Sequence, residues 1–204
     1  MVYHFAHEHG PFGFCEEINI PKLKVEEYID WRRALIEETR RSKEVFKKHF
    51  QSKYGDEHEN LPLWMVAELM SMGSMLTFFK GVSPDIKRKV AVTFGLPDEV
   101  MLSWLRSLNA VRNICAHHAR LWNRVLGYPP LLPSMKYTEW HQDYWLPNNR
   151  SGVLLMMCRH LLKTITPTSR CHERVEALFD EYAEVPVRLM GLSENWRSHP
   201  VWME

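Results

Sequence analysis

An arginine, a polar residue and a histidine lie close together in the segment LNAVRNICAHHARLWNR, residues 108–124. Arg112 carries a planar guanidinium, which binds phosphate oxygens through a fixed set of donors. Asn113 follows it directly, and His117 lies five positions after Arg112. Histidine is the side chain that most often transfers protons near neutral pH. These residue types at this spacing form a compact set for cleaving RNA without a metal.

The same region is free of acidic residues over a long stretch. No aspartate or glutamate occurs between Glu99 and Glu139, whereas four arginines and Lys136 do. Clustered positive charge without nearby carboxylates favours an anion, and phosphate is the anion that Arg binds best. Besides the catalytic candidates Arg112, Asn113 and His117, we expect flanking phosphates to contact Arg106, Arg120, Asn123 and Arg124. Trp122 can stack on a base, although tryptophans more often lie in a core or an interface.

Composition limits the class of protein. The chain has 204 residues, of which 45% are hydrophobic and 25% charged, and this composition is typical of a globular protein. Its formal net charge of +1 excludes a globally basic nucleic-acid binder. Neither an apolar run of the roughly 18 residues that a membrane span needs nor a signal peptide is apparent. The four cysteines show no CxxC spacing. We therefore expect a cytoplasmic protein with no membrane partner.

The sequence contains no Gly-rich phosphate loop and no dinucleotide-binding fingerprint, so we expect no cofactor. His4, His7, His9 and Cys15 are close in sequence, but their spacing matches no common zinc pattern. We expect no specific metal site.

Alternating strand patterns are absent, and the chain is expected to be all-α, a helical bundle in one domain over residues 1–204. Residues 1–21 are interpreted as an irregular lead-in, residues 134–150 as an aromatic loop that includes Tyr144 and Trp145, and residues 186–204 as a tail with Trp196 and Trp202. Helix signals predict helices over 24–53, 63–79, from Pro84 to Gly95, from about Pro97 to Val125, over 151–165 and over 169–183.

A continuous motif helix would set the geometry of the candidate site. Residues three or four apart would form one polar stripe, made of Arg106, Asn109, Asn113, His117, Arg120 and Arg124. His118 would lie in a second, mostly apolar stripe. Arg112 would lie about 140° from His117 around the helix axis. Either the helix is distorted at this point, or a second copy of the motif completes the site.

At these residues the sequence resembles the Abi-like (abortive infection) family of bacterial proteins, part of the wider HEPN group. The matching segments are HGPFGF (9–14), LPLWMVAELMSMGSM (61–75), LNAVRNICAHHARLWNR (108–124) and MGLSENWRSHPVW (190–202). Arg112 and His117 match the R-x4-6-H motif of the group, and the third segment is quite specific. The resemblance implies a HEPN-like helical bundle, a homodimer that brings two motifs together, a role in phage defence, and RNA cleavage or RNA binding. It also indicates an N-terminally shortened member.

The expected reaction is transesterification, in which the RNA 2′-hydroxyl attacks its neighbouring phosphate. His117 can act as general acid or base, Arg112 can stabilise the charged phosphorane oxygens, and Asn113 can bind phosphate or orient the imidazole. Two alternatives stay open. The same basic surface would suit a non-catalytic module that holds a structured or partner RNA, and a polar helix face would also suit a protein-interaction domain.

Overall fold

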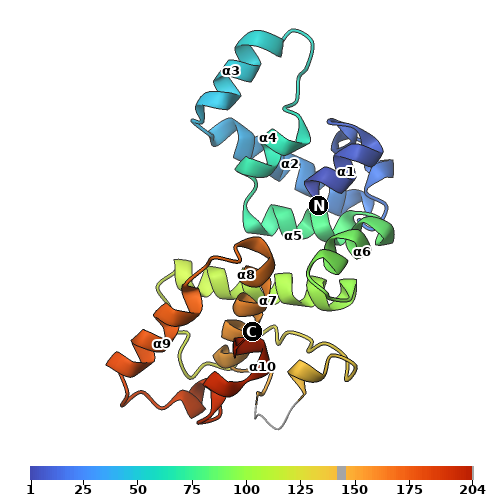
Figure 1. The fold of residues 1–204 in the computed structure, drawn as a ribbon. Coiled ribbons are helices and arrows are strands. Elements are labelled where there is room, and N and C mark those ends of the chain that lie inside the picture. The colour runs from blue at the N-terminus through green and yellow to red at the C-terminus, as the bar shows by residue number, and fades with distance from the viewer. Residues whose placement is uncertain (142–145, 204) are drawn as a thin grey trace. The chain divides into compact units, whose positions relative to one another are not determined.

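The computed structural model describes residues 1–141 and 146–203, and this part of the chain is helical without a strand (Figure 1). The prediction of an all-α protein is confirmed. The α-helices are α1 Val2–His9, α2 Val25–Arg41, α3 Val45–Tyr54, α4 Leu63–Leu69, α5 Met72–Gly81, α6 Pro84–Thr93, α7 Asp98–Ala116, α8 Ser151–Ile165, α9 Cys171–Glu181 and α10 Pro200–Met203. Short 3-10 helices are η1 Gly13–Cys15, η2 Glu17–Asn19, η3 Thr138–Trp140, η4 Val187–Met190 and η5 Trp196–Ser198.

The chain divides into two compact units, Met1–Ala91 and Val92–Glu204. We call them unit 1 and unit 2 and describe each separately. The single Abi-like domain over residues 1–204 stays a prediction.

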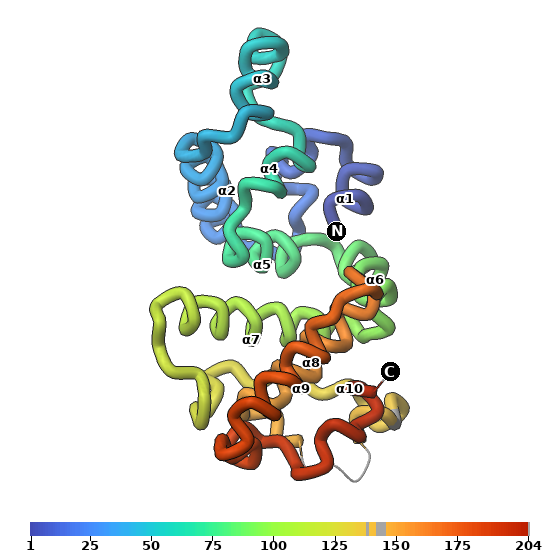
Figure 2. Tube along the Cα trace, turned by 60° about the vertical axis from the view of Figure 1, so that its left-hand side comes forward, coloured from blue at the N-terminus to red at the C-terminus, as the bar shows by residue number. Residues whose placement is uncertain are grey.

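The core of unit 1 is organised around Trp31. In this unit α2 packs against α4 and α5, and α1 packs against α4 (Figure 2). The Trp31 ring stacks on Phe78, with the ring centroids 5.2 Å apart, and its Nε1–H donates to the Ser74 carbonyl at 2.9 Å. Phe5 from α1 meets the edge of Phe78 at 4.9 Å. One buried aromatic cluster therefore joins three helices, and its polar atom is satisfied inside the core.

Two helices that the sequence predicts as continuous are each broken by a serine. The helix expected over 24–53 stops at Arg41, where Ser42 is extended and its hydroxyl accepts the backbone N–H of Glu44 at 3.2 Å. The helix expected over 63–79 is interrupted at Met70, and Ser71 then caps α5 by accepting the backbone N–H of Ser74 at 3.1 Å. Serine hydroxyls compete with the helical backbone for hydrogen bonds, which is why both breaks occur there.

The core of unit 2 includes Trp104, which is fully buried on α7. Its Nε1–H donates to the Leu131 carbonyl at 2.8 Å, and its ring lies 5.2 Å from Trp140 and 5.4 Å from His160 of α8. These contacts hold part of the segment between α7 and α8 against both helices. Of the aromatic loop expected over 134–150, Tyr144 and Trp145 lie outside the described residues.

The two ends of the chain are more ordered than the sequence suggests. The expected irregular lead-in contains α1, η1 and η2, and the Tyr28 hydroxyl donates to the Cys15 carbonyl at 2.5 Å. The expected tail contains η4, η5 and α10, and α10 packs against α8 (Figure 1). Trp196 and Trp202 are both buried, and Trp202 Nε1–H donates to Glu176 at 2.6 Å. Burial of large aromatic side chains explains the order of this end.

The end of α7 differs most from the sequence prediction, because the helix stops at Ala116 and does not continue to Val125. His118 has a φ of 52°, in the left-handed region. Its N–H donates to the Cys115 carbonyl at 3.0 Å, and the N–H of Ala119 donates to the Ile114 carbonyl at 3.0 Å. These two bonds define a Schellman motif, in which His118 occupies the position that glycine usually takes.

None of the described helices has the length and apolarity to cross a membrane.

The left-handed conformation of His118 yields a stability prediction. We expect His118→Gly to leave the free energy of unfolding unchanged or to raise it by up to about 1 kcal/mol, since glycine adopts this conformation without strain. We expect His118→Val to lower it by about 1–2 kcal/mol, because a β-branched side chain resists positive φ. Urea denaturation measures both. Equal stability of the two variants would contradict the assignment of the helix stop to His118.

His199 yields a prediction about pH. Its side chain is 2% exposed, burial lowers its pKa to about 4, and its Nδ1 accepts the backbone N–H of Val201 at 3.2 Å, at the start of α10. Because the unfolded chain binds the proton more tightly, the neutral imidazole stabilises the fold above the unfolded pKa, and this stability is lost as pH falls from about 6.5 towards 4. We expect a loss of about 3 kcal/mol over this range.

The matched variant is His199→Asn, which keeps an acceptor for the helix N-terminus but does not titrate. Chemical denaturation at a series of pH values between 4 and 7 measures the difference between the two proteins. Parallel stability curves would show that His199 does not contribute to the acid sensitivity.

Candidate functional site

The three motif residues lie at the C-terminal end of α7, in unit 2. Arg112 and Asn113 are in the last part of the helix, His117 is its C-cap residue, and all three are exposed. Arg112 Nη1–H donates to Asn113 Oδ1 at 3.2 Å. The catalytic candidates are therefore accessible to a large substrate, and the side chains of Arg112 and Asn113 are linked by a hydrogen bond.

Arg112 and His117 do not form a pair within one copy of the chain. Because α7 is helical through Ala116, the two residues remain about 140° apart around its axis. Among the described residues no hydrogen bond links Arg112 to His117. One chain by itself thus brings together Arg112 and Asn113 but leaves His117 on another side of the helix.

The predicted polar stripe is shorter than the sequence suggests. Arg106, Asn109 and Asn113 lie on α7 at intervals of three and four residues, and His117 follows at the cap. The stripe was predicted to continue to Arg120 and Arg124, and this is wrong because the chain leaves the helix at His118. These two arginines lie instead on the irregular segment that follows α7.

The backbone gives no help in binding an anion at this end of the helix. The free carbonyls of the last turn place the negative end of the helix dipole at the C-terminus. Phosphate is attracted to the opposite end of a helix. Any affinity of this site for phosphate therefore depends on its side chains, and the arginines around α7 supply the charge.

The segment after α7 forms a shallow basic depression of about 380 Å³. Its lining residues are Arg120, Asn123, Arg124 and Val125, all of them exposed. Asn123 has a φ of 54°, so the chain turns sharply at this residue. The structure thus brings three of the predicted RNA-binding residues together, although by a turn and not by a helix. Arg106 is exposed on α7 and does not line this depression.

Arg150 also belongs to this surface, although it was not among the residues predicted from the sequence. Its Nη1–H donates to Asn123 Oδ1 at 3.1 Å and contacts the Asn123 carbonyl at 3.5 Å. The backbone N–H of Leu126 also donates to the Asn149 carbonyl at 2.9 Å. The start of α8 therefore fixes the turn that carries the basic residues. The only signal in the sequence was that Arg150 belongs to the same acid-poor region.

The start of α8 is itself held by a glycine contact. Gly191 has a φ of 82°, and a Cβ added to it would lie 2.7 Å from the Cβ of Arg150. Only glycine allows this close approach without a shift of the backbone. The position of Arg150 thus depends on packing within unit 2.

Trp122 is half-buried, and its Nε1 atom is buried without a hydrogen-bond partner among the described residues. Its ring is therefore partly occupied by contacts with the protein, which limits the face that a base can reach. The stacking role of Trp122 stays a prediction.

No group of three potential metal ligands from His, Cys, Asp or Glu occurs within the described residues.

Comparison with known proteins adds one match. The model of the Abi-like protein family matches residues 1–123, which include the motif on α7 and end at Asn123, before Arg124 and Arg150. No curated protein and no solved structure matches the chain. Since the matched segment spans more than half of the 204 residues and contains Arg112, Asn113 and His117, the chain belongs to the Abi-like protein family.

Proposed function

We propose that this protein is a HEPN-group endoribonuclease of phage defence that cleaves RNA without a metal, with Arg112, Asn113 and His117 as its catalytic residues. Membership of the Abi-like family supports a role in abortive infection. The observation that carries the nuclease proposal is the exposure of all three residues at the end of α7, followed directly by a basic depression.

The reaction that suits these residues is transesterification. A histidine base removes the proton from the 2′-hydroxyl, the 2′-oxygen attacks the adjacent phosphorus, and the bond to the 5′-oxygen breaks. An acid returns a proton to the leaving 5′-oxygen, giving a 2′,3′-cyclic phosphate and a 5′-hydroxyl. Arg112 offsets the negative charge on the phosphorane oxygens. DNA lacks the 2′-hydroxyl and is therefore not a substrate.

The proposed active form is a homodimer. The angle between Arg112 and His117 leaves each copy without a paired Arg–His set, and a second copy of α7 can supply the missing group. Two His117 side chains in one composite site can divide the roles of acid and base. The RNA on either side of the cleaved bond is proposed to contact six residues: Arg106, Arg120, Trp122, Asn123, Arg124 and Arg150.

A second candidate function is an RNA-holding module without catalysis. One observation favours it: among the described residues no hydrogen bond orients the His117 ring. Arg112 and Asn113, by contrast, are hydrogen-bonded to each other. Catalytic bases are commonly oriented by a partner, although such bonds can form only with substrate bound. Both functions use the same basic surface, so binding and cleavage must be measured together.

The first test is cleavage of labelled total RNA in EDTA. We expect wild type to produce 2′,3′-cyclic phosphate ends, and His117→Ala and Arg112→Ala to reduce the rate by about 100-fold or more, as loss of an acid–base or charge-stabilising group does. The control is His118→Asn, which removes the adjacent histidine but tolerates the left-handed conformation. Cleavage by His117→Ala at the wild-type rate would refute the proposed ribonuclease with His117 as a catalytic residue. If the wild-type protein binds RNA but does not cleave it, the RNA-holding module is favoured.

The dimer is tested by complementation. We expect co-expressed His117→Ala and Arg112→Ala chains, each inactive alone, to regain part of the wild-type rate, because a mixed dimer contains one intact Arg112 and one intact His117. Light scattering at micromolar concentration measures the assembly state independently. A monomer that cleaves RNA would contradict the composite site. A mixed dimer without activity would contradict a site in which one Arg112 and one His117 suffice.

A further inference from the structure

A small cavity in unit 2 brings two cysteines from different helices together. Its volume is about 20 Å³, and it is bordered by α8, α9, α10 and the connection between α8 and α9. Cys158 of α8 and Cys171 of α9 both line it. A space of this size holds about one water molecule, so the residues that line it lie close to one another. The fold therefore places two thiols beside the same small space.

The electrostatics of Cys158 indicate the same neighbour. Burial raises the pKa of the Cys158 thiol above its ordinary value, and the negative charge of a Cys171 thiolate raises it further. Coulombic interactions weaken with distance, so an effect of one thiolate on another thiol requires that the two side chains be near each other. Both cysteines are free thiols in the structure. Cys158 thus keeps its proton at neutral pH until a partner reacts with it.

The two thiols differ in their access to solvent. Cys171 is exposed at the start of α9, where the positive end of the helix dipole favours negatively charged groups. Cys158 is half-buried, and the cavity beside it is too small for a peptide such as glutathione. Leu155, Leu162 and Trp202 add apolar walls to this cavity. A dissolved oxidant therefore meets Cys171 first, and Cys171 is the thiol that can reach Cys158 from within the chain.

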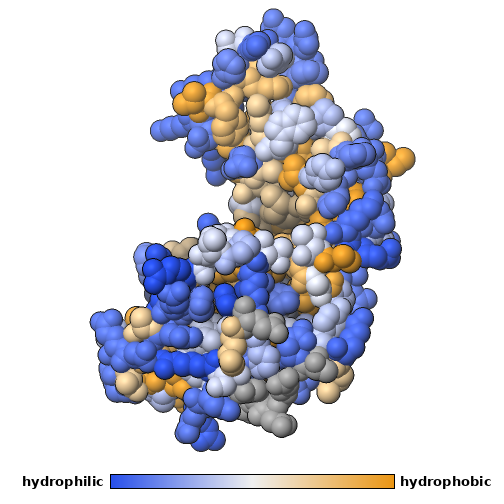
Figure 3. Space-filling view, viewed as in Figure 1, coloured by the Kyte–Doolittle hydropathy of each residue, from blue (hydrophilic) through white to orange (hydrophobic). Residues whose placement is uncertain are grey.

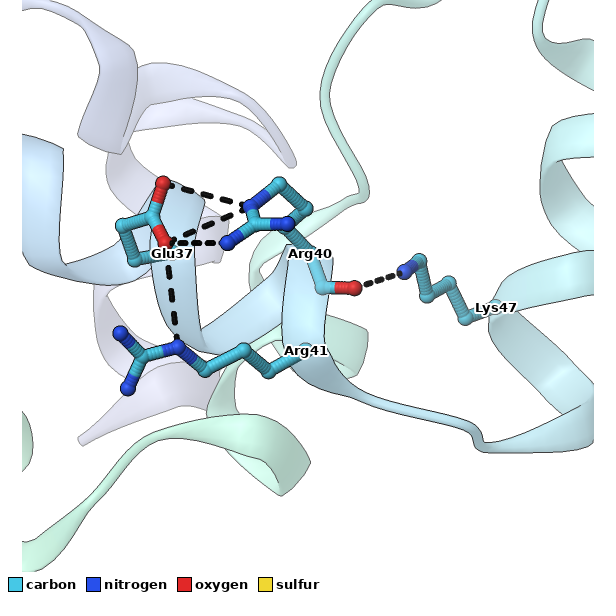
Figure 4. Close-up of polar contacts among 4 residues, drawn as sticks. All are labelled: Glu37, Arg40, Arg41 and Lys47. Carbon is cyan, nitrogen blue, oxygen red and sulfur yellow. Dashed lines mark hydrogen bonds and ion pairs between the residues drawn. The ribbon is translucent and has the colours of Figure 1, made fainter.

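The junction of α2 and α3 in unit 1 shows how polar groups can fasten consecutive helices. In Figure 4 the Glu37 carboxylate binds Arg40, with Nη2 and Oε2 2.9 Å apart, and it also binds Arg41. Lys47 of α3 donates to the carbonyl of Arg40 at 3.1 Å, which ties the two helices directly. The cavity between α8 and α9 is lined instead by two thiols, which are weak hydrogen-bonding groups. A covalent bond between them would fasten these helices more firmly.

Polar contacts hold the second half of α9. Glu176 accepts the Trp202 Nε1–H at 2.6 Å, and Asp180 pairs with Arg197 at 2.5 Å. None of the described side chains of α9 is buried, and Leu178 is 53% exposed. In Figure 3 the part of unit 2 around α9 shows apolar residues among hydrophilic ones. A bond at Cys171, the first residue of α9, would therefore add a fixed point at the other end of a lightly packed helix.

We propose that Cys158 and Cys171 form a reversible disulfide when the protein meets a hydroperoxide, and that this bond fastens the start of α9 to α8. The pair lies in unit 2 and uses none of the motif residues, so the proposal does not depend on the ribonuclease.

The reaction has two steps. The Cys171 thiolate attacks the terminal oxygen of the hydroperoxide, the O–O bond breaks, and the sulfur is oxidised to a sulfenic acid while the hydroperoxide is reduced to an alcohol or water. The Cys158 sulfur then attacks the Cys171 sulfur, and the S–O bond breaks. The leaving hydroxide takes the Cys158 proton, which gives a disulfide and one water molecule. A thiol reductant reverses the change.

The test treats the reduced full chain with hydrogen peroxide, alkylates the remaining thiols, and maps the peptides by mass spectrometry without reduction. We expect two peptides joined through Cys158 and Cys171, lighter than the reduced pair by two hydrogen atoms and separated by dithiothreitol. Amide hydrogen exchange in the first turns of α9 should be slower by about tenfold or more in the oxidised protein, because the bond restrains local opening. Unchanged exchange would contradict the fastening of α9.

Two variants separate the steps of the reaction. In Cys158→Ser we expect the Cys171 sulfenic acid to persist and to react with dimedone, because no second thiol resolves it. In Cys171→Ser the Cys158 thiol should stay reduced, since the cavity shields it from the oxidant. Circular dichroism confirms that each variant is folded, and Cys171→Ser, at an exposed position, carries the test if Cys158→Ser unfolds.

The matched control is Cys115→Ser, which removes another exposed cysteine that does not line this cavity. It should form the same disulfide as wild type. His117→Ala should form it as well, so failure of the nuclease and failure of this pair are distinguishable. Oxidation of Cys171 to its sulfinic acid while Cys158 remains a thiol, or a bond from Cys171 to another copy of the chain, would overturn the inference.

Discussion

The geometry of the candidate site depends on one feature, the left-handed turn at His118 that ends α7. It leaves His117 at the helix cap and sends the following basic segment away from the helix axis. If the helix continued, the arginines of that segment would lie in line with Asn113 along a single rod. The turn instead gathers Arg120 and Arg124 around Asn123 and so concentrates their positive charge on one surface.

The formal net charge of +1 conceals an uneven distribution. Unit 1 contains equal numbers of basic and acidic residues, fourteen of each, whereas residues 100–170 contain nine basic and two acidic ones. Local charge of this kind makes binding to a polyanion sensitive to salt even though the whole chain is nearly neutral. The net charge of the whole chain therefore does not reveal the basic region.

The all-α class and the presence of most helices could be predicted from the sequence, because apolar periodicity and capping residues are local signals. The ends of the helices could not. Ser42 and Ser71 break helices through hydroxyl bonds that compete with the backbone, and His118 ends α7 where the sequence has no glycine. Arg150 could not be assigned to the site either, since its contact with Asn123 joins residues 27 positions apart and depends on packing at Gly191.

The bond between Arg150 and Asn123 has a consequence for how the motif can be transferred between proteins. The family match ends at Asn123, and the side chain that fixes this residue comes from beyond it. The backbone bond from Leu126 to Asn149 lies beyond it as well. A chimaera joined at the end of the matched segment would therefore carry the motif with an unsupported turn, and a graft that keeps the site intact must include the first residues of α8.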